Sequence, residues 1–238
     1  MKIGLVGAGA IGTAIAGRLA AASEVVSVVA RGRRRDSILR DGLKFREDSE
    51  NCAVRVPVVG VQGLADRDVV IVVTKTRALP ELLHELKPAL PSSTLLMSAV
   101  NGLPWWYFQG DGSLSGTVLH YVDPAGEMLQ LFDPERLIGC VVYSRASMDN
   151  DHEVETLGQQ RLKIGAVGRG RVPLALFEQL TEVGIVVSVE DNVRSEIWAK
   201  LVRNTSTNVV SGLFDFYNHT GGRKYLMAAS TTPAPTFR

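Results

Sequence analysis

Three glycines near the amino terminus have the spacing G-x-G-x-x-G, which is typical of a loop that holds phosphate groups. The apolar stretch Lys2–Val6 before them predicts a buried strand, and the alanine-rich residues 10–22 after them predict a helix. In such a unit the first glycine permits a tight turn, the second lets the backbone approach a pyrophosphate, and the third lets the helix pack close to the sheet. We therefore expect a dinucleotide on this loop, and a purely structural glycine turn is the alternative. The predicted contact residues are Gly7, Ala8, Gly9, Ala10, Ile11 and Gly12.

An arginine follows the second predicted strand, at the position that distinguishes NAD from NADP. The strand is Val25–Ala30, the residue is Arg31, and three more arginines occupy 33–35. Enzymes that use NAD place Asp or Glu there, about 20 residues after the glycines, to bind the ribose 2′-hydroxyl. A carboxylate would repel the 2′-phosphate of NADP, whereas a guanidinium can hold it with two charge-assisted hydrogen bonds. Arg31 therefore predicts NADPH/NADP+ as the cofactor, and an exposed basic loop without a ligand is the alternative.

Two more polar side chains follow predicted strands of the same sheet. Lys75 ends the apolar run Val69–Thr74, and Asn101 comes shortly after Leu95–Ser98. Because the carboxyl ends of parallel strands face the ligand crevice, both residues are candidates for contact with cofactor or substrate. An ordinary surface lysine and an ordinary Asn-Gly turn are the alternatives.

A third set of candidates lies further along the chain, at Lys200, Asn204 and Asn208. Their spacing of four places them on one stripe of a helix, next to its apolar face. Amides at such a border need hydrogen-bond partners. Those partners are either the neighbouring backbone or a polar substrate to which Lys200 donates a proton, and the spacing alone leaves both open.

Strand and helix signals alternate along the chain as in repeated βαβ units, so we expect an α/β protein. The fold predicted is a Rossmann-type parallel-sheet domain over residues 1–189, followed by a helical second domain over 190–238 that starts at Asp191 or Asn192 and ends in an irregular tail. A small β excursion is expected at 43–45 and 54–59. The other expected strands are 137–143, 161–164 and 185–189, and the other expected helices are 80–90 and 173–183.

Composition narrows the class of protein further. A net charge of +1 gives no electrostatic basis for binding nucleic acid or an anionic membrane, so neither partner is expected. The apolar run Ile3–Gly17 carries the glycine motif, which favours a strand–turn–helix unit over a secretory signal, and no other run approaches the ~20 residues that span a bilayer. Cys52 and Cys140 do not form a spaced framework. We expect a cytoplasmic protein with two free thiols and no metal site.

Several segments together resemble the ketopantoate reductase family, the 2-dehydropantoate 2-reductases. They are the glycine motif, VVARG after the second strand, the strand-end lysine, NGLPWWYF, and NVRSEIWAKLVRNTSTN. The resemblance runs in the right order from Met1 to about Leu213. It implies a Rossmann domain followed by an all-helical domain, and the reduction of 2-dehydropantoate to (R)-pantoate with NADPH, a step in pantothenate and coenzyme A synthesis.

The resemblance also implies roles for individual residues. Lys200 matches the family's catalytic lysine, the general acid toward the carbonyl oxygen. Asn204 and Asn208 would bind polar groups of the 2-oxoacid substrate. Lys75 and Asn101 would bridge the nicotinamide ribose and the substrate, which places Asn101 among the catalytic residues.

After Leu213 the sequence departs from the family's pattern, which continues with helices that carry a serine and a glutamate of the substrate site. We therefore expect a truncated helical domain, and two alternatives to the family activity stay open. One is a catalytically impaired NADP-binding module, and the other is a reductase of another branched 2-oxoacid. Apolar residues on a helix without covering neighbours favour a homodimer. These residues are Trp198, Leu201, Val202, Val209 and Val210.

Overall fold

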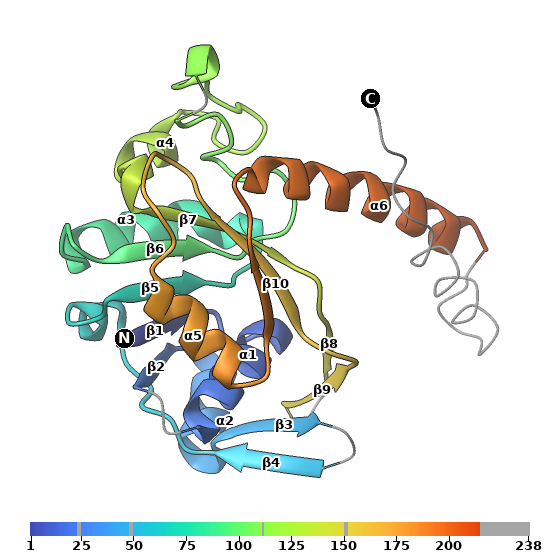
Figure 1. Ribbon diagram of the computed structural model, residues 1–238. Coiled ribbons are helices and arrows are strands. Elements are labelled where there is room, and N and C mark those ends of the chain that lie inside the picture. Colours follow the sequence, from blue (N-terminus) through green and yellow to red (C-terminus); the bar gives the residue numbers. More distant parts are fainter. Residues whose placement is uncertain (23–24, 48–49, 111, 150–151, 215–238) are drawn as a thin grey trace. The chain divides into compact units, whose positions relative to one another are not determined.

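The chain divides into two compact units, Met1–Arg194 and Ser195–Arg238 (Figure 1). The first unit holds the β-sheets, and the second holds most of helix α6 (Val193–Phe214). The predicted domain boundary at residue 189 stays a prediction. The computed structural model describes residues 1–22, 25–47, 50–110, 112–149 and 152–214, with the backbone alone described at 47, 50 and 206–214.

In the described part of the first unit, a seven-stranded sheet has the order β11-β10-β7-β6-β5-β1-β2. The five strands from β7 to β2 run parallel, β10 is antiparallel to β7, and β11 is parallel to β10. Val6, the last residue of β1, therefore lies between Val29 of β2 and Val72 of β5. The strands are β1 (Ile3–Val6), β2 (Val26–Val29), β5 (Val69–Val72), β6 (Leu95–Ser98), β7 (Leu137–Val142), β10 (Arg161–Ala166) and β11 (Val186–Val189).

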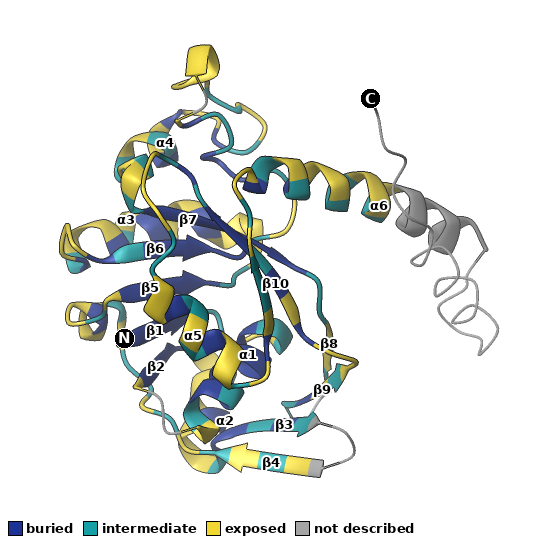
Figure 2. Cartoon of the chain, in the orientation of Figure 1, coloured by how far each residue is buried: buried dark blue, intermediate teal, exposed yellow. Residues whose placement is uncertain are grey.

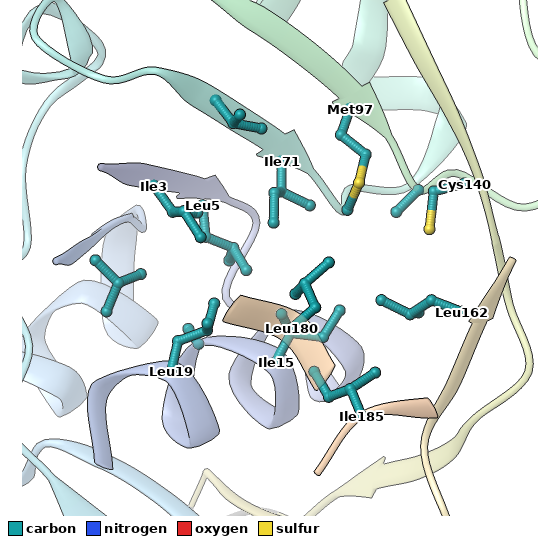
Figure 3. Close-up of a cluster of buried hydrophobic side chains, with 14 of the residues drawn as sticks. Ile3, Leu5, Ile15, Leu19, Ile71, Met97, Cys140, Leu162, Leu180 and Ile185 are labelled. Atoms are coloured by element: carbon teal, nitrogen blue, oxygen red, sulfur yellow. The ribbon is translucent and has the colours of Figure 1, made fainter. Parts of the chain in front are cut away.

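Helices cover both faces of this sheet. Helix α1 (Ala10–Ala21) connects β1 to β2, and α3 (Leu79–Ala89) connects β5 to β6 in the opposite direction along the sheet. Because βαβ crossovers are right-handed, α1 and α3 lie on opposite faces. Helix α5 (Leu174–Glu182) joins α1 in one buried apolar cluster against the sheet (Figure 3). The inner strands are consequently buried on both sides and are apolar without alternation (Figure 2).

A second sheet packs against the outer side of α1. Its strands have the order β4-β3-β9-β8, and Ala14 of α1 clusters with Phe45 and Val154 of this sheet. A Cβ atom on Gly17 would lie only 2.6 Å from the Phe45 ring, so the helix approaches the sheet at this glycine. Helix α1 is thus buried between two sheets, which explains its small and apolar sequence. The strands are β3 (Leu43–Glu47), β4 (Glu50–Val54), β8 (Arg145–Met148) and β9 (Glu153–Leu157).

The loop after β6 packs close to Val193, the first residue of α6, within the first unit. Trp105 and Trp106, from the NGLPWWYF segment, are fully buried. Gly139 leaves room for the Trp106 ring and for Val193, since a Cβ atom there would lie 2.6 Å from the ring and 2.9 Å from Val193 Cγ1. The two tryptophans are therefore core residues of the first unit.

Arg194 ties the end of the first unit to the same loop. Its Nε donates to the carbonyl of Tyr107 at 2.7 Å, and its Nη2 donates to the carbonyls of Gln109 and Val167. The Asn192 side chain accepts from the Arg194 backbone N–H at 3.2 Å, as an N-cap does. The NGLPWWYF segment and residues 192–194, far apart in sequence, therefore meet within the first unit.

The predicted α/β class with a Rossmann-type sheet is confirmed, but helices α2 (Gly32–Asp41) and α4 (Glu127–Leu131) and strands β8 and β9 were not predicted. Helix α2 is mostly polar and buries little beyond Ser37 and Ile38, so it has no apolar stripe to detect. Strands β8 and β9 are short and polar. Strand β9 pairs with β3, which comes about a hundred residues earlier, and β8 pairs with β9. The remaining elements are short 3₁₀ turns at Val61–Leu64, Thr76–Ala78, Gly112–Leu114 and Pro134–Arg136.

The strand predicted over 54–59 is wrong. The observed strand β4 ends at Val54, where it pairs with Leu43 of β3. Residues after Val54 leave the small sheet, and Val58 forms an isolated bridge with Val28 at the edge of the large one. The β-branched residues of 54–59 gave a strand signal, but the pairing partner decided where the strand ends.

Cys52 and Cys140 are free thiols, as predicted. Among the helices that the structure describes, none is long and apolar enough to cross a membrane.

Gly139→Ala is expected to lower the free energy of unfolding by about 1–3 kcal/mol, because its Cβ atom would overpack the Trp106 ring and Val193. Gly60→Ala is the matched control, since no described atom lies within 4 Å of a Cβ atom there and its φ of −78° suits alanine. Urea unfolding monitored by tryptophan fluorescence measures both. Equal stability of the two variants would contradict the packing described.

Candidate functional site

The glycine loop between β1 and α1 is built on two close backbone approaches. Gly7 has φ +108°, and a Cβ atom there would collide with the carbonyl oxygen of Val73, after β5. A Cβ atom on Gly12 would collide with the carbonyl oxygen of Gly7 and would lie 3.1 Å from the Leu5 side chain. Gly7 and Gly12 therefore make the turn itself possible, and Gly12 serves the loop's own closure as well as the predicted approach of helix to sheet.

Gly9 has a different role, because a Cβ atom there would meet no described atom within 4 Å. Gly9 is the N-cap of α1, and its carbonyl accepts the N–H of Thr13 at 2.8 Å. In the described chain no side chain caps this helix, and its first turn holds no acidic residue. The first backbone N–H groups of the helix and the positive end of its dipole therefore face open space, with no side-chain acceptor or acidic residue in the first turn. This cradle fits a diphosphate, whose oxygens can approach the backbone where a side chain is missing.

The side chain of Arg34 holds the glycine loop in place by hydrogen bonds. Its Nε donates to the carbonyl of Ala8 at 2.9 Å, its Nη2 to Thr13 Oγ1 at 2.7 Å, and its Nη1 to the carbonyl of His152 at 3.0 Å. Thr13 Oγ1 in turn donates to the Ala8 carbonyl at 3.3 Å. Burial lowers the pKa of the Arg34 guanidinium. This arginine of the predicted basic loop is thus a structural clamp, which its sequence neighbourhood did not reveal.

Arg31 lies at the N-cap of α2, directly beyond the end of β2, where the predicted 2′-phosphate contact requires it. Its Nη2 forms an ion pair with Glu85 Oε2 at 2.6 Å. The side chains of Arg31 and Glu85 are 59% and 38% exposed, so both can reach a ligand. The sequence has no acidic residue at the end of β2, but the fold brings Glu85 of α3 to this place. Only the tertiary structure brings this carboxylate to the arginine.

Lys75 and Asn101 lie at the sheet edge that holds the glycine loop. Lys75 follows β5 and Asn101 follows β6, and these strands pair in parallel next to β1. Both residues are exposed. The predicted placement at the carboxyl ends of neighbouring strands is therefore observed, and their contacts with a ligand stay a prediction.

Lys200 and Asn204 lie one helical turn apart on α6, and both are half-buried. Asn208 continues the same spacing on the helix backbone, and its side chain lies outside the described residues. The predicted helix is confirmed, and the chemical roles of these three residues stay predictions.

The parallel sheet with its glycine loop at the N-terminus of α1 defines a Rossmann-type domain. Residues 3–169 match the family described as Ketopantoate reductase PanE/ApbA. A 2-dehydropantoate 2-reductase from Mesorhizobium japonicum is 37% identical over 218 residues, which cover 90% of this chain and 67% of that protein. The chain belongs to the ketopantoate reductase family.

Two more similarities agree with this family. A 2-dehydropantoate 2-reductase from Pyrococcus horikoshii is 26% identical over 220 residues, which cover 92% of this chain and 65% of that protein. The crystal structure of a candidate ketopantoate reductase from Ralstonia solanacearum MolK2 superposes with a TM-score of 0.83 and 29% identity, covering 95% of this chain and 73% of that one. This chain thus spans about two thirds of the length of the two curated relatives.

Alanine at Gly12 and alanine at Gly9 are expected to separate the structural from the ligand-facing glycines. Gly12→Ala should lower the free energy of unfolding by about 1–3 kcal/mol, because its Cβ atom meets backbone that cannot rotate away. Gly9→Ala should leave stability within about 0.5 kcal/mol, because it faces open space.

Gly9→Ala should nevertheless weaken NADPH binding by about tenfold or more, since the methyl group would occupy the cradle. Urea unfolding and NADPH fluorescence titration on both variants measure these effects. Unchanged NADPH affinity in folded Gly9→Ala would remove the cradle from the binding site.

Proposed function

We propose that this chain binds NADPH and reduces the ketone of 2-dehydropantoate (ketopantoate) to the alcohol of (R)-pantoate. The observation that carries the proposal is the open cradle at Gly9, on an uncapped helix N-terminus, with Arg31 at the end of the neighbouring strand. A diphosphate and a 2′-phosphate are the anions that such a pair of positions suits. The substrate follows from the family, since the Mesorhizobium relative is named 2-dehydropantoate 2-reductase.

The first unit provides the cofactor contacts in this proposal. Backbone N–H groups of Gly7–Gly12 bind the diphosphate, and Arg31 binds the 2′-phosphate. Lys75 and Asn101, at the same edge of the sheet, bind the nicotinamide ribose and the substrate. Bound NADPH supplies the hydride that the carbonyl carbon accepts.

Helix α6 provides the acid. Reduction of a ketone needs a proton on the carbonyl oxygen as the hydride reaches the carbon, and a lysine ammonium both delivers that proton and stabilises the developing alkoxide. Lys200 takes this role because it matches the catalytic lysine of the family motif. Asn204 and Asn208 hydrogen-bond the polar groups of the substrate.

The proposal is tested by adding ketopantoate to the protein with NADPH and following NADPH fluorescence and pantoate formation together. Consumption of NADPH with equal formation of pantoate is expected. A panel of other branched 2-oxoacids in the same assay addresses the alternative substrate. NADPH binding without turnover of any of them would favour a cofactor-binding module over a reductase.

We also infer that the chain acts in the cytoplasm as a homodimer. Free thiols at Cys52 and Cys140 agree with a reducing compartment. Trp198 and Val202 of α6 are 53% and 56% exposed, which agrees with an apolar surface that a second copy covers. Leu201 is half-buried, and the side chains of Val209 and Val210 lie outside the described residues.

Arg31→Ala is expected to weaken NADPH binding by roughly tenfold and to leave NADH binding nearly unchanged, because a charge-assisted contact to a phosphate is worth about 1.5–3 kcal/mol. Arg40→Ala removes the same charge from the last turn of α2, where Arg40 pairs with Asp41, and should change neither affinity. Fluorescence titration with both nucleotides measures the effect. Equal losses for NADPH and NADH would contradict the assignment of Arg31 to the 2′-phosphate.

Lys200→Ala is expected to lower kcat for ketopantoate by about 10²–10⁴, the usual contribution of a positioned general acid. NADPH affinity should stay unchanged, because the proposed cofactor contacts come from the first unit. Arg203→Ala, which removes an exposed cation from the same helix, is the control and should retain kcat. Steady-state kinetics decide the point, and full activity of Lys200→Ala would exclude this lysine from the mechanism.

A further inference from the structure

The pairing of Arg31 with Glu85 changes what the arginine can do for a nucleotide. The two side chains come from separate elements, the N-cap of α2 and the middle of α3, and meet at 2.6 Å between Nη2 and Oε2. Neither is needed to fill the core, since both are substantially exposed. The contact therefore engages the guanidinium group that the proposed function assigns to the 2′-phosphate.

A phosphate that binds Arg31 must either displace the Glu85 carboxylate or share the guanidinium group with it. If the phosphate takes the Nη2 donor, it displaces Glu85, and the ion pair is lost. If both anions share the five N–H donors of the guanidinium, two negative groups stand a few ångströms apart and repel each other. Either way, the free energy of binding a 2′-phosphate becomes less favourable.

NADH carries a hydroxyl where NADPH carries the 2′-phosphate, so it needs neither the displacement of Glu85 nor the close approach of two anions. A carboxylate at this place can instead accept a hydrogen bond from a ribose hydroxyl, as the acid after β2 does in NAD enzymes. The arrangement thus combines a phosphate-binding residue with a residue that opposes phosphate.

We propose that Glu85 is a specificity-determining residue that competes with the 2′-phosphate for Arg31 and so reduces the preference of this chain for NADPH over NADH. The proposal rests on the proposed function, because it requires Arg31 to contact the adenosine ribose. It assigns to Glu85 a role in the choice of cofactor and none in the transfer of hydride or proton.

Glu85→Gln tests the proposal, because glutamine keeps the size of the side chain and removes its charge. NADPH affinity is expected to rise by about three- to ten-fold, the range for losing an exposed ion pair together with a nearby like charge. NADH affinity should stay the same or fall. Fluorescence titrations with NADPH and NADH on folded protein give both dissociation constants.

Two further variants show whether the effect acts through the contact. Glu81→Gln removes a carboxylate one turn earlier on the same helix and should change NADPH affinity by less than twofold. In an Arg31→Ala background, Glu85→Gln should give a smaller gain than in the natural chain, because competition for the guanidinium is gone.

The outcomes distinguish the role of Glu85 from the proposed function. NADPH affinity that is equal in Glu85→Gln and the natural chain overturns the role of Glu85 and leaves the proposed function intact. Equal gains for NADPH and NADH, a matching gain in Glu81→Gln, or an undiminished gain without Arg31 overturns it as well. Failure of the natural chain to bind either nucleotide overturns the proposed function, and the role of Glu85 with it.

Discussion

In the first turn of helix α1, Gly12 lies against the carbonyl oxygen of Gly7, and this approach of backbone to backbone fixes the direction in which the helix leaves the sheet. Gly7 lies in turn against the carbonyl of Val73, which follows the neighbouring strand β5, so the loop is packed between the end of that strand and its own helix. No side chain larger than hydrogen fits at either position. Gly9 lies between these two contacts and faces open space.

The same helix joins the two sheets. One side of α1 packs on the large sheet through residues such as Ile15 and Leu19, and Gly17 on the other side meets Phe45 of the small sheet. Arg34 extends this arrangement, since it connects the glycine loop, Thr13 and the chain before β9 by three hydrogen bonds. Loss of packing at the small sheet would therefore reach the loop through α1 and Arg34, although the small sheet holds none of the proposed cofactor residues.

Arginines in this chain serve two separate purposes, and the surroundings of each arginine decide which. Arg34 and Arg194 each satisfy backbone carbonyls of loops and lie half-buried, so their charge is used for architecture. Arg31 remains exposed, and its partner is a carboxylate that a phosphate group can displace. The contrast between Arg31 and Arg34, three residues apart, supports the assignment of cofactor binding to the first of them.

The sequence by itself determined the strands of the large sheet, the glycine loop and the helix after Asn192, because these depend on local signals: buried apolar runs, glycine spacing and helical period. It also placed Lys75 and Asn101 correctly at the edge of the sheet, since the ends of parallel strands follow from their order. It did not determine the strand order in the sheet or the antiparallel direction of β10. Strands β8 and β9, the clamp at Arg34 and the pairing of Arg31 with Glu85 were decided only by the tertiary structure. Each of these joins segments that are separated along the chain and carry polar side chains with no periodic pattern. Their partners are set by the packing of α1 between the two sheets and by the contact of α2 with α3 through Arg31 and Glu85.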